Sequence, residues 1–584
     1  MLIIGLEHVQ MQRESVLRRV DALWEALATR FWLSFCIYLV LAPVVELAFH
    51  LNVRRFLHGR SRQPHRTRSD VKDNDEVFTF WIHLLSEESV ERIDDMVSGW
   101  FVDAALERRR SKRNPLVSSP KHRRPAAPRR GNVFQLIAWT LYNRDLASLS
   151  REELAHAEQI VRKIEARRGV AYLPGTDPKL LCMRHTLGEL EMVWKPFCFY
   201  LGALGLQRLA ESALHWRGFQ RVQPCSLGGL EYWHLPAPTG GLHTGVGSEP
   251  IVLMHGVGGL TAYVPFCFQI SSIYAVPILV PCFPSCTIRL PTLASPPPLA
   301  TSELVAAIEA MVVAHATPAA AAAARHSPGT LAGRGDASPG FLSDSASDGS
   351  VGSAAPTLDG SAPPYRRGHH PARTAAAAPA NTAPAHTSTR VEAQPGATST
   401  PTTATFVAHS MGTAFLAATL RARPQLAKSA LFVDPVCFLL YRRDVLYNFL
   451  YRQTALRRSW FRPSKWFHLA LHRFITREPC MQCCFRRDFW WSQYLLHPCD
   501  IPCDAAVLLS GHDAIVNAND VHKYLLEQAA SLKRDPAAAA AAGAHELRVE
   551  MHAGRNHGWL MIVPWISRGV LEHLAALRQR HAPR

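Results

Sequence analysis

The sequence predicts an α/β fold built around a mostly parallel sheet. Short apolar runs, each bounded by turn residues, alternate with stretches of helical pattern over much of the chain. Runs of this kind are typical of strands that are buried on both faces, as in parallel sheets. The alternation favours crossover connections, which pair neighbouring strands in parallel. With 584 residues and a hydrophobic content of 48%, the chain can fill a large core.

The N-terminal region, residues 1–70, is predicted to hold a transmembrane helix at about residues 31–51. This run, FWLSFCIYLVLAPVVELAFHL, is the most apolar stretch of the chain, and a helix of about 20 residues crosses a bilayer. Pro43 and Glu46 fit a span less well, so a buried helix of a folded domain is the alternative. The flank after the run is the more basic one. This favours a single-pass membrane protein with the rest of the chain in the cytosol.

Residues 71–217 are predicted to be helical, apart from a basic linker at residues 108–130. Ser150 and Glu153 have the spacing of a capping box, which predicts a helix that begins at Arg151. The linker is dense in lysine and arginine, contains no acid and includes proline and serine, as solvated segments do. No recognised nucleic-acid module accompanies the net charge of +17. We therefore expect anionic lipid headgroups, and no nucleic acid, to meet this segment.

Residues 218–315 are predicted to form the first part of the α/β domain. The segment from Gly218 alternates in hydrophobicity and carries turn residues, which is typical of a hairpin at the start of a sheet. Buried strands are expected at residues 250–254 and 275–280, and a helix at residues 303–315.

Residues 316–403 are predicted to be a disordered insertion. This tract of Ala, Ser, Pro, Thr and Gly has scarcely any large apolar side chain, so it cannot bury enough surface to order itself. The strand pattern resumes in residues 404–584, with runs at 404–408, 430–433, 505–509 and 546–549. The insertion is therefore expected to interrupt one domain, whose second part is residues 404–584.

The sequence ATFVAHSMGTA, residues 404–414, places a serine where a strand changes sharply into a helix. Ala408 and Gly412 flank Ser410 in the pattern G-x-S-x-G, with alanine for the first glycine. Small neighbours are needed because the strand and the helix approach closely around an exposed serine. Ser350 lies in a similar pentapeptide, DGSVG, but no strand precedes it in that low-complexity tract. Ser410 is therefore the candidate nucleophile, with a structural serine in a degenerate turn as the alternative.

A serine hydroxyl needs a base within hydrogen-bond reach, and the base needs an acid that orients it. Asp513 follows the apolar run at residues 505–509, and His557 lies between the last predicted strand and a final helix. The chain order is then serine, acid, histidine, which is the order of one particular fold. Asp434 also ends a predicted strand and is the alternative acid.

Four motifs in this order resemble those of the α/β-hydrolase superfamily. They are HGVGG from His255, AHSMG from Ala408, SGHDAIV from Ser510 and GRNHGW from Gly554. The helical region that precedes them is similar to that of membrane-anchored serine hydrolases of fungi and algae. The resemblance covers residues 218–313 and 404–584, and implies an α/β-hydrolase fold with helices on both faces of the sheet.

The resemblance also implies roles for individual residues. Ser410 would attack an acyl carbonyl, His557 would take and return the proton, and Asp513 would orient the imidazole. Backbone N–H groups of Met411 and of Val257 or Gly258 would hold the oxyanion. The segment at about residues 435–500 would cap the site. Its arginines and aromatic residues fit either a cap packed inward or an amphipathic surface that meets a membrane.

The sequence thus predicts a membrane-associated serine hydrolase that cleaves carboxylic esters, lipid esters among them. An acyltransferase or thioesterase with the same triad and a catalytically silent scaffold are the alternatives. Nothing in the sequence calls for a metal or an organic cofactor. Cys480, Cys483 and Cys484 are expected to be reduced, partly buried thiols, with zinc binding or S-acylation as alternatives.

Overall fold

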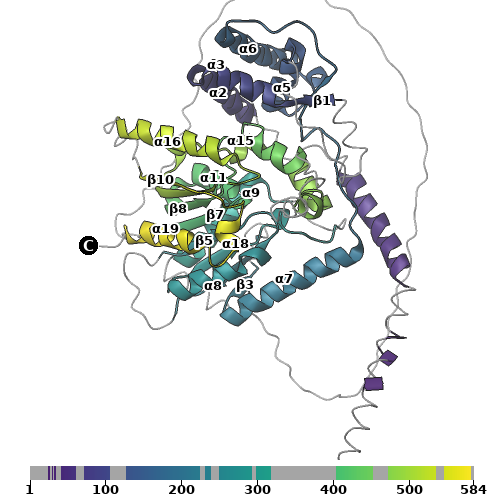
Figure 1. The fold of residues 1–584 in the computed structure, drawn as a ribbon, viewed down its shortest axis with the longest axis vertical. Helices are drawn as coiled ribbons and strands as arrows, with labels where there is room; N and C mark the ends of the chain where they lie inside the picture. The colour runs from purple at the N-terminus through teal and green to yellow at the C-terminus, as the bar shows by residue number, and fades with distance from the viewer. Residues whose placement is uncertain are drawn as a thin grey trace, which may run out of the picture. The chain divides into compact units, whose positions relative to one another are not determined.

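The structure is a computed structural model (Figure 1). The chain divides into two compact units. The first consists of Met1–Ala324 and Pro401–Arg584, and the second of Arg325–Thr400. The second unit, with most of the predicted insertion at residues 316–403, lies outside the described residues. The described residues are 24–25, 29–30, 32–33, 41–60, 71–104, 127–223, 230–238, 249–291, 298–316, 403–451, 471–534 and 545–580.

Eight strands form one sheet in the order β10-β9-β8-β7-β5-β6-β4-β3 (Figure 1). The six strands from β10 to β6 are parallel, and β4 pairs antiparallel with both β6 and β3. The mostly parallel sheet and its opening hairpin are therefore confirmed. The strands are β3 (Gln220–Val222), β4 (Tyr232–Leu235), β5 (Ile251–Met254), β6 (Ile278–Pro281), β7 (Ala404–His409), β8 (Ala427–Val433), β9 (Asp504–Ser510) and β10 (Leu547–His552).

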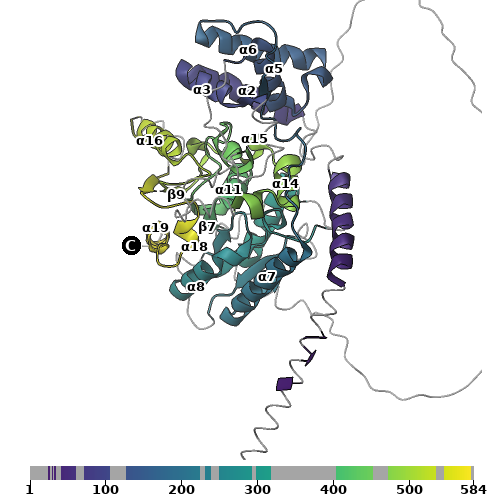
Figure 2. The same cartoon turned by 45° about the vertical axis from the view of Figure 1, so that its right-hand side comes forward.

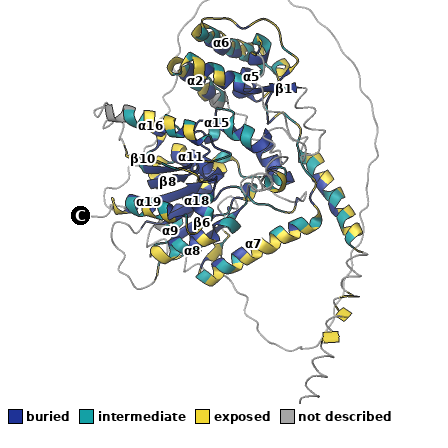
Figure 3. Ribbon diagram, viewed as in Figure 1, coloured by how far each residue is buried: buried dark blue, intermediate teal, exposed yellow. Residues whose placement is uncertain are grey.

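Side chains alternate between the two faces of the sheet, so each central strand contributes to two hydrophobic clusters. Phe406 and Phe432 belong to one cluster, and their neighbours Val407 and Leu431 belong to the other. Figure 3 shows the sheet buried between helices on both faces. One face is covered by α9 (Thr301–Ala316), α11 (Met411–Ala422) and α16 (Ala518–Arg534), the other by α8 (Val264–Ile273) and α19 (Arg568–Gln579).

The sheet joins residues from both sides of the predicted insertion. Strand β5 pairs with β7 in parallel register, with Ile251 opposite Thr405 and Met254 opposite Ala408. Because β7 leads directly into α11, this pairing brings the loop after β5 to the turn that carries Ser410. The α/β domain therefore contains chain from before and after residues 317–402.

The helical region before the sheet consists of α2 (Val71–Glu87), α3 (Val90–Gly99), α5 (Arg130–Tyr142), η1 (Leu146–Ser148), α6 (Arg151–Arg168) and α7 (Phe197–Arg217), with β1 (Phe101–Asp103) pairing antiparallel to β2 (Leu180–Cys182). Helix α6 begins at Arg151, as predicted. The Ser150 hydroxyl accepts the N–H of Glu153, whose carboxylate accepts the N–H of Ser150 in return. Residues 108–126, which are most of the basic linker predicted at residues 108–130, lie outside the described residues.

The apolar run at about residues 31–51 is described only in part, because residues 31 and 34–40 are not described. Residues 41–60 form a helix that packs through Phe49 and Val53 against Tyr200 of α7. No helix in the described part of the chain is long and apolar enough to cross a membrane. The span therefore stays a prediction.

Short helices and turns connect the strands around the site. Those after β5 and β6 are η2 (Leu260–Tyr263) and η3 (Pro284–Cys286), and α18 (Trp559–Ile562) follows β10. Between α11 and β8 lies η4 (Pro424–Leu426). The predicted cap, residues 435–500, contains α12 (Asp444–Leu446), η5 (Tyr447–Tyr451), η6 (Leu471–Thr476), α14 (Pro479–Cys483), η7 (Cys484–Asp488), α15 (Trp491–Tyr494) and η8 (Pro498–Asp500), and its residues 452–470 are not described.

The close approach of α11 to β5 predicts a stability effect at Gly412. A Cβ there would overlap the carbonyl oxygen of Met254 and lie 2.9 Å from that of His255. Gly412→Ala should therefore lower the free energy of unfolding by about 1–3 kcal/mol, as overpacking of a core does. Thermal denaturation measures this.

The matched control is Gly202→Ala, a glycine inside α7 where an added Cβ meets nothing within 4 Å. That variant should melt at or slightly above the wild-type temperature, because alanine stabilises a helix interior relative to glycine. Equal melting temperatures for Gly412→Ala and wild type would contradict the close approach.

Candidate active site

Ser410 occupies the turn between β7 and α11 in a strained conformation. Its φ of 52° and ψ of −122° lie in a region that L-amino acids rarely adopt. Backbone hydrogen bonds on both sides hold it there. The N–H of Ser410 donates to the carbonyl of Val433 at 3.1 Å, and the N–H and hydroxyl of Thr413 donate to the carbonyl of Ser410 at 2.9 and 2.6 Å. The turn has the geometry predicted for a nucleophile elbow.

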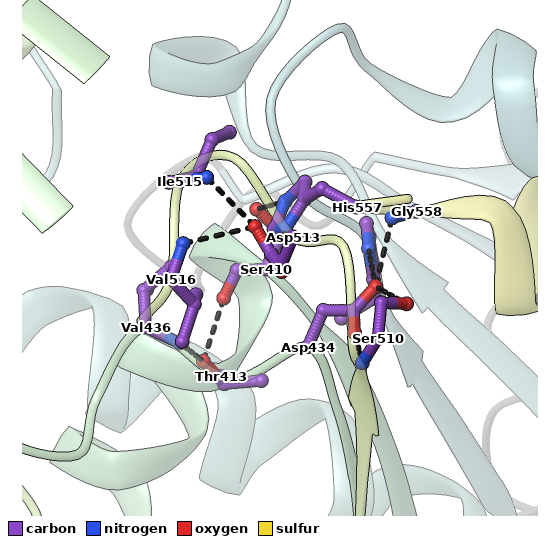
Figure 4. Close-up of polar contacts among 12 residues, drawn as sticks. Ser410, Thr413, Asp434, Val436, Ser510, Asp513, Ile515, Val516, His557 and Gly558 are labelled. Atoms are coloured by element: carbon purple, nitrogen blue, oxygen red, sulfur yellow. Dashed lines mark hydrogen bonds and ion pairs between the residues drawn. The ribbon is translucent and has the colours of Figure 1, made fainter. Parts of the chain in front are cut away.

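The structure brings Ser410, His557 and Asp513 together as a hydrogen-bonded chain. The Nε2 atom of His557 lies 2.9 Å from the Ser410 Oγ, and its Nδ1 lies 2.6 Å from the Asp513 Oδ2 (Figure 4). A carboxylate only accepts hydrogen bonds, so Nδ1 carries the proton and Nε2 is left as an acceptor for the serine hydroxyl. This is the tautomer that a general base requires.

Asp513 is itself held in place by the loop that follows β9. Its Oδ1 atom accepts the N–H of Ile515 at 2.7 Å and that of Val516 at 2.9 Å. The other oxygen, Oδ2, is thereby aimed at His557 (Figure 4). A further hydrogen bond, from the N–H of His512 to the carbonyl of Arg555 at 2.8 Å, ties this acid loop to the histidine loop.

The surroundings of His557 favour its protonated form. Burial alone lowers the pKa of the imidazole, but the negative charge of Asp513, the hydrogen bond to it and the charge of Asp434 together outweigh burial. The net result is a pKa above the ordinary value of 6.5. The imidazolium that forms when the base takes a proton is therefore stabilised in advance.

Asp434, the alternative acid, lies at the same site but in a different role. It is fully buried, and its carboxylate accepts the N–H and hydroxyl of Ser510 at 2.8 and 3.0 Å and the N–H of Gly558 at 2.8 Å. Within the described site, no hydrogen bond joins it to His557. Burial, together with the nearby charge of Asp513, raises the pKa of Asp434 to about 6. Its hydrogen bonds connect the end of β9 to the histidine loop (Figure 4).

The oxyanion loop meets the elbow directly. A Cβ on Gly256 would lie 2.8 Å from the Cβ of Ser410, so only glycine fits there. Of the two loop donors that the sequence suggested, the N–H of Gly258 donates to the carbonyl of Cys286 at 2.8 Å and is not available. No described residue accepts the N–H of Val257. Met411, the first residue of α11, presents an N–H that its own helix does not use.

A buried polar chain that sequence reasoning missed connects this loop to the elbow. The N–H of Gly256 donates to the Tyr263 hydroxyl at 2.9 Å, and that hydroxyl lies 2.5 Å from the Nδ1 of His409. Burial, with the neighbouring His557 and His255, lowers the pKa of His409 well below 6.5, so its ring is neutral. Its Nδ1 can then accept from the tyrosine hydroxyl. Only the position of Tyr263, soon after HGVGG, could have signalled this link.

A cavity of about 480 Å³ opens beside Ser410 and is lined almost entirely by apolar side chains. The cap contributes several of them, including Leu440, Phe449, Phe485 and Phe489. Among the described residues, no aspartate, glutamate, lysine or arginine lines it. The part of the cap that is described thus turns aromatic and aliphatic side chains towards the reacting serine.

One group of possible metal ligands occurs among the described residues: Asp434, Asp513 and His557, whose ligand atoms lie within 4.8 Å of one another. Hydrogen bonds already engage both nitrogens of His557 and the Oδ2 of Asp513, so the group is a polar network. Cys480, Cys483 and Cys484 form no disulfide. Burial raises the pKa of Cys483 to about 12, which keeps this thiol protonated at neutral pH.

Comparison with known proteins finds distant likeness only. No family model and no curated protein matches the sequence. Similar solved structures include carboxylesterase CesB of Bacillus subtilis (9% identity, 64% of this chain, 99% of that one, TM-score 0.34), naproxen esterase of Bacillus subtilis (10%, 64%, 97%, 0.33) and a membrane phospholipase A that is a bacterial virulence factor (10%, 65%, 94%, 0.35). Likeness this distant does not bear on activity.

Asp513→Asn should remove the group that selects the imidazole tautomer. The amide nitrogen would donate to Nδ1 and leave the proton on Nε2, where it faces the serine. We expect kcat for ester hydrolysis to fall by about 10⁴-fold, with the melting temperature little changed. Asp434→Asn is the matched control and should lose far less. If kcat fell by about 10⁴-fold in Asp434→Asn and stayed at the wild-type value in Asp513→Asn, Asp434 would be the orienting acid.

Asp434→Asn should also change the pH dependence of kcat/KM. The negative charge of Asp434 raises the pKa of His557, so its removal should lower that pKa. The acidic limb of the profile, which follows deprotonation of the base, should then move to lower pH. Glu550→Gln removes an exposed charge on β10 and should leave the limb in place. An unmoved or upward-shifted limb in Asp434→Asn would show that its charge does not act on His557.

Proposed function

We propose that the protein is a serine hydrolase that cleaves carboxylic esters through an acyl-enzyme intermediate. The observation that supports this most strongly is the chain from Ser410 through His557 to Asp513, at 2.9 and 2.6 Å, on a strained turn beside an apolar cavity. A structural serine has no need of an oriented base, nor of a backbone conformation that costs about 1–3 kcal/mol. A catalytically silent scaffold accounts for neither feature.

In the first half of the reaction, the Nε2 of His557 takes the proton of Ser410 while Oγ forms a bond to the acyl carbon. The carbonyl oxygen gains negative charge, which the N–H groups of Val257 and Met411 would stabilise, each by about 3–4 kcal/mol in the transition state. The bond to the leaving alkoxide then breaks, and the His557 imidazolium gives it the proton. Asp513 stabilises the imidazolium throughout without accepting its proton.

In the second half, the Nε2 of His557 takes a proton from water, and the hydroxide oxygen bonds to the acyl carbon. The bond from that carbon to Ser410 breaks, the serine oxygen recovers its proton from the imidazolium, and a carboxylic acid leaves. An alcohol in place of water would give a new ester, so the same residues could carry acyl transfer. The products formed in the presence of added alcohol distinguish the two reactions.

The cavity favours a neutral, hydrophobic ester as substrate. Transfer of a charged group into an apolar site without a partner is costly, and no aspartate, glutamate, lysine or arginine among the described residues lines this cavity to provide one. Its volume of about 480 Å³ is in the range of small-molecule sites. Lipid esters with an uncharged region around the scissile bond fit this chemistry.

We further propose that the protein is membrane-associated, with the apolar run at residues 31–51 as a single-pass anchor and the catalytic portion in the cytosol.

Ser410→Ala tests the proposal. Purified full-length protein should hydrolyse a medium-chain p-nitrophenyl ester, and the variant should lose activity by roughly 10⁶-fold, down to the background rate. Ser350→Ala, in the similar pentapeptide DGSVG, is the matched control and should retain full activity. An ester bearing a carboxylate on its acyl chain should be a poor substrate for wild type. Equal rates of ester hydrolysis by Ser410→Ala and wild type would contradict a mechanism in which Ser410 is the nucleophile.

A further inference from the structure

Helix α7 (Phe197–Arg217) carries apolar side chains on its outward face as well as its inward one. Its buried residues are Tyr200, Ala210 and Leu214, which share one side of the helix. On the opposite side Leu201, Leu209 and Trp216 are 50%, 69% and 81% exposed. A helix at the surface of a soluble domain normally turns charged residues outward. The first half of α7, FCFYLGALGL, contains no charge at all.

The helix at residues 41–60 packs against α7 and also exposes apolar side chains. Its Phe49 packs against Phe197 and Tyr200 at ring-centroid distances of 5.4 and 5.3 Å, and the Glu46 carboxylate accepts the N–H of Phe197 at 2.7 Å. On its outward side Val44 and Leu47 are 64% and 61% exposed. Figure 2 shows the two helices near each other, and Figure 3 shows much exposed surface on both. We call the exposed apolar residues Leu41, Val44, Leu47, Leu51, Leu201, Leu204, Leu209 and Trp216 the apolar face.

The exposed charged residues of the two helices are all arginines. They are Arg54, Arg55 and Arg208, of which Arg208 pairs with Glu211 at 2.9 Å, while Glu46 and Glu211 are partly buried. Exposed apolar side chains on helices that also expose arginines match the lipid–water interface, where acyl chains meet anionic headgroups. Trp216 at the far end of α7 is the residue type that is enriched at that interface. This complementarity favours a bilayer as the occupant over a second copy of the chain, whose own net charge is +17.

Helix α7 also borders the cavity beside Ser410. Ala203, Leu206 and Gln207 of α7 line that cavity, and Leu206 is also 59% exposed. Across from them, Phe474 of the cap lines the cavity, is 45% exposed and stacks on Phe199 of α7 at 5.8 Å. The same helix therefore contributes one wall of the cavity and the outward apolar surface next to it.

We propose that the apolar face docks on the surface of a lipid bilayer, and that a neutral ester passes from the bilayer to Ser410 along α7. Leu41, Val44, Leu47 and Leu51 belong to the run proposed as the anchor at residues 31–51, whereas the outward side chains of α7 do not, so the docking is tested on α7. The route to Ser410 rests on the proposed esterase function, whereas the docking itself does not. The two are therefore tested separately.

Hydroxyl-radical footprinting with mass spectrometry tests the docking without any need for catalysis. Full-length Ser410→Ala protein is labelled with and without vesicles of phosphatidylcholine and phosphatidylserine. Labelling of Leu201, Leu209 and Trp216 should fall several-fold with vesicles, while Val170 and Leu173, which are 65% and 70% exposed in the loop after α6, stay equally labelled. Unchanged labelling of the apolar face would overturn the proposal. Protection already present without vesicles would overturn it too, and would identify another segment or a second copy as the occupant.

A double variant tests the route to the serine. Leu201→Asp with Leu209→Asp changes two residues that do not line the cavity. It should hydrolyse a water-soluble short-chain ester at the wild-type rate but a neutral ester embedded in vesicles at least ten-fold more slowly. The matched control, Val170→Asp with Leu173→Asp, should keep both rates. Wild-type rates on both substrates for the α7 variant would contradict the proposal. If wild type cleaves neither ester, the esterase function fails, and the footprint still decides the docking.

Discussion

The close contact between the turn at Ser410 and the loop after β5 is the constraint on which the site depends. Gly412 lets α11 approach the carbonyl oxygens of Met254 and His255, and Gly256 lets the oxyanion loop touch the Cβ of Ser410. Neither position has room for a side chain. Ser410 adopts a strained φ of 52° at this contact. Hydrogen bonds of Val433 and Thr413 to its backbone stabilise that conformation. The serine hydroxyl thereby lies 2.9 Å from the Nε2 of His557, with the oxyanion loop in contact with the Cβ atom of the same serine.

Buried polar groups, which must be hydrogen-bonded, connect the separate loops of this site. Asp434 joins the end of β9 to the histidine loop through Ser510 and Gly558, and Tyr263 joins the oxyanion loop to His409 beside the nucleophile. In an apolar surrounding each such bond is expensive to break. The loops that carry the acid, the base and the oxyanion donor are therefore fixed relative to the elbow by polar contacts in a site whose cavity is otherwise apolar.

The sequence predicted the parts of this structure that depend on local pattern. Strands with uninterrupted apolar runs, such as β5 and β7, and the capped start of α6 were found because periodicity and capping are local signals. The order of Ser410, Asp513 and His557 was sufficient to propose that they meet. The sequence did not predict the part of Asp434 in holding the histidine loop or the loss of the Gly258 N–H to Cys286. Those outcomes depend on contacts between segments that are distant in the sequence, and local patterns in one sequence carry no information about such contacts. The outward apolar side of α7 was missed because a run of apolar residues in a helix does not say which side is covered.

Covalent labelling tests whether Ser410 is a nucleophile activated by His557. Full-length protein is treated with a fluorophosphonate, digested, and the modified residue is located by mass spectrometry. We expect a single adduct on Ser410 whose rate of formation rises with pH through a pKa above 6.5, as His557 loses its proton. A protein that forms no adduct on Ser410, or forms it at a rate that does not change when His557 is replaced by alanine, would contradict this role of Ser410.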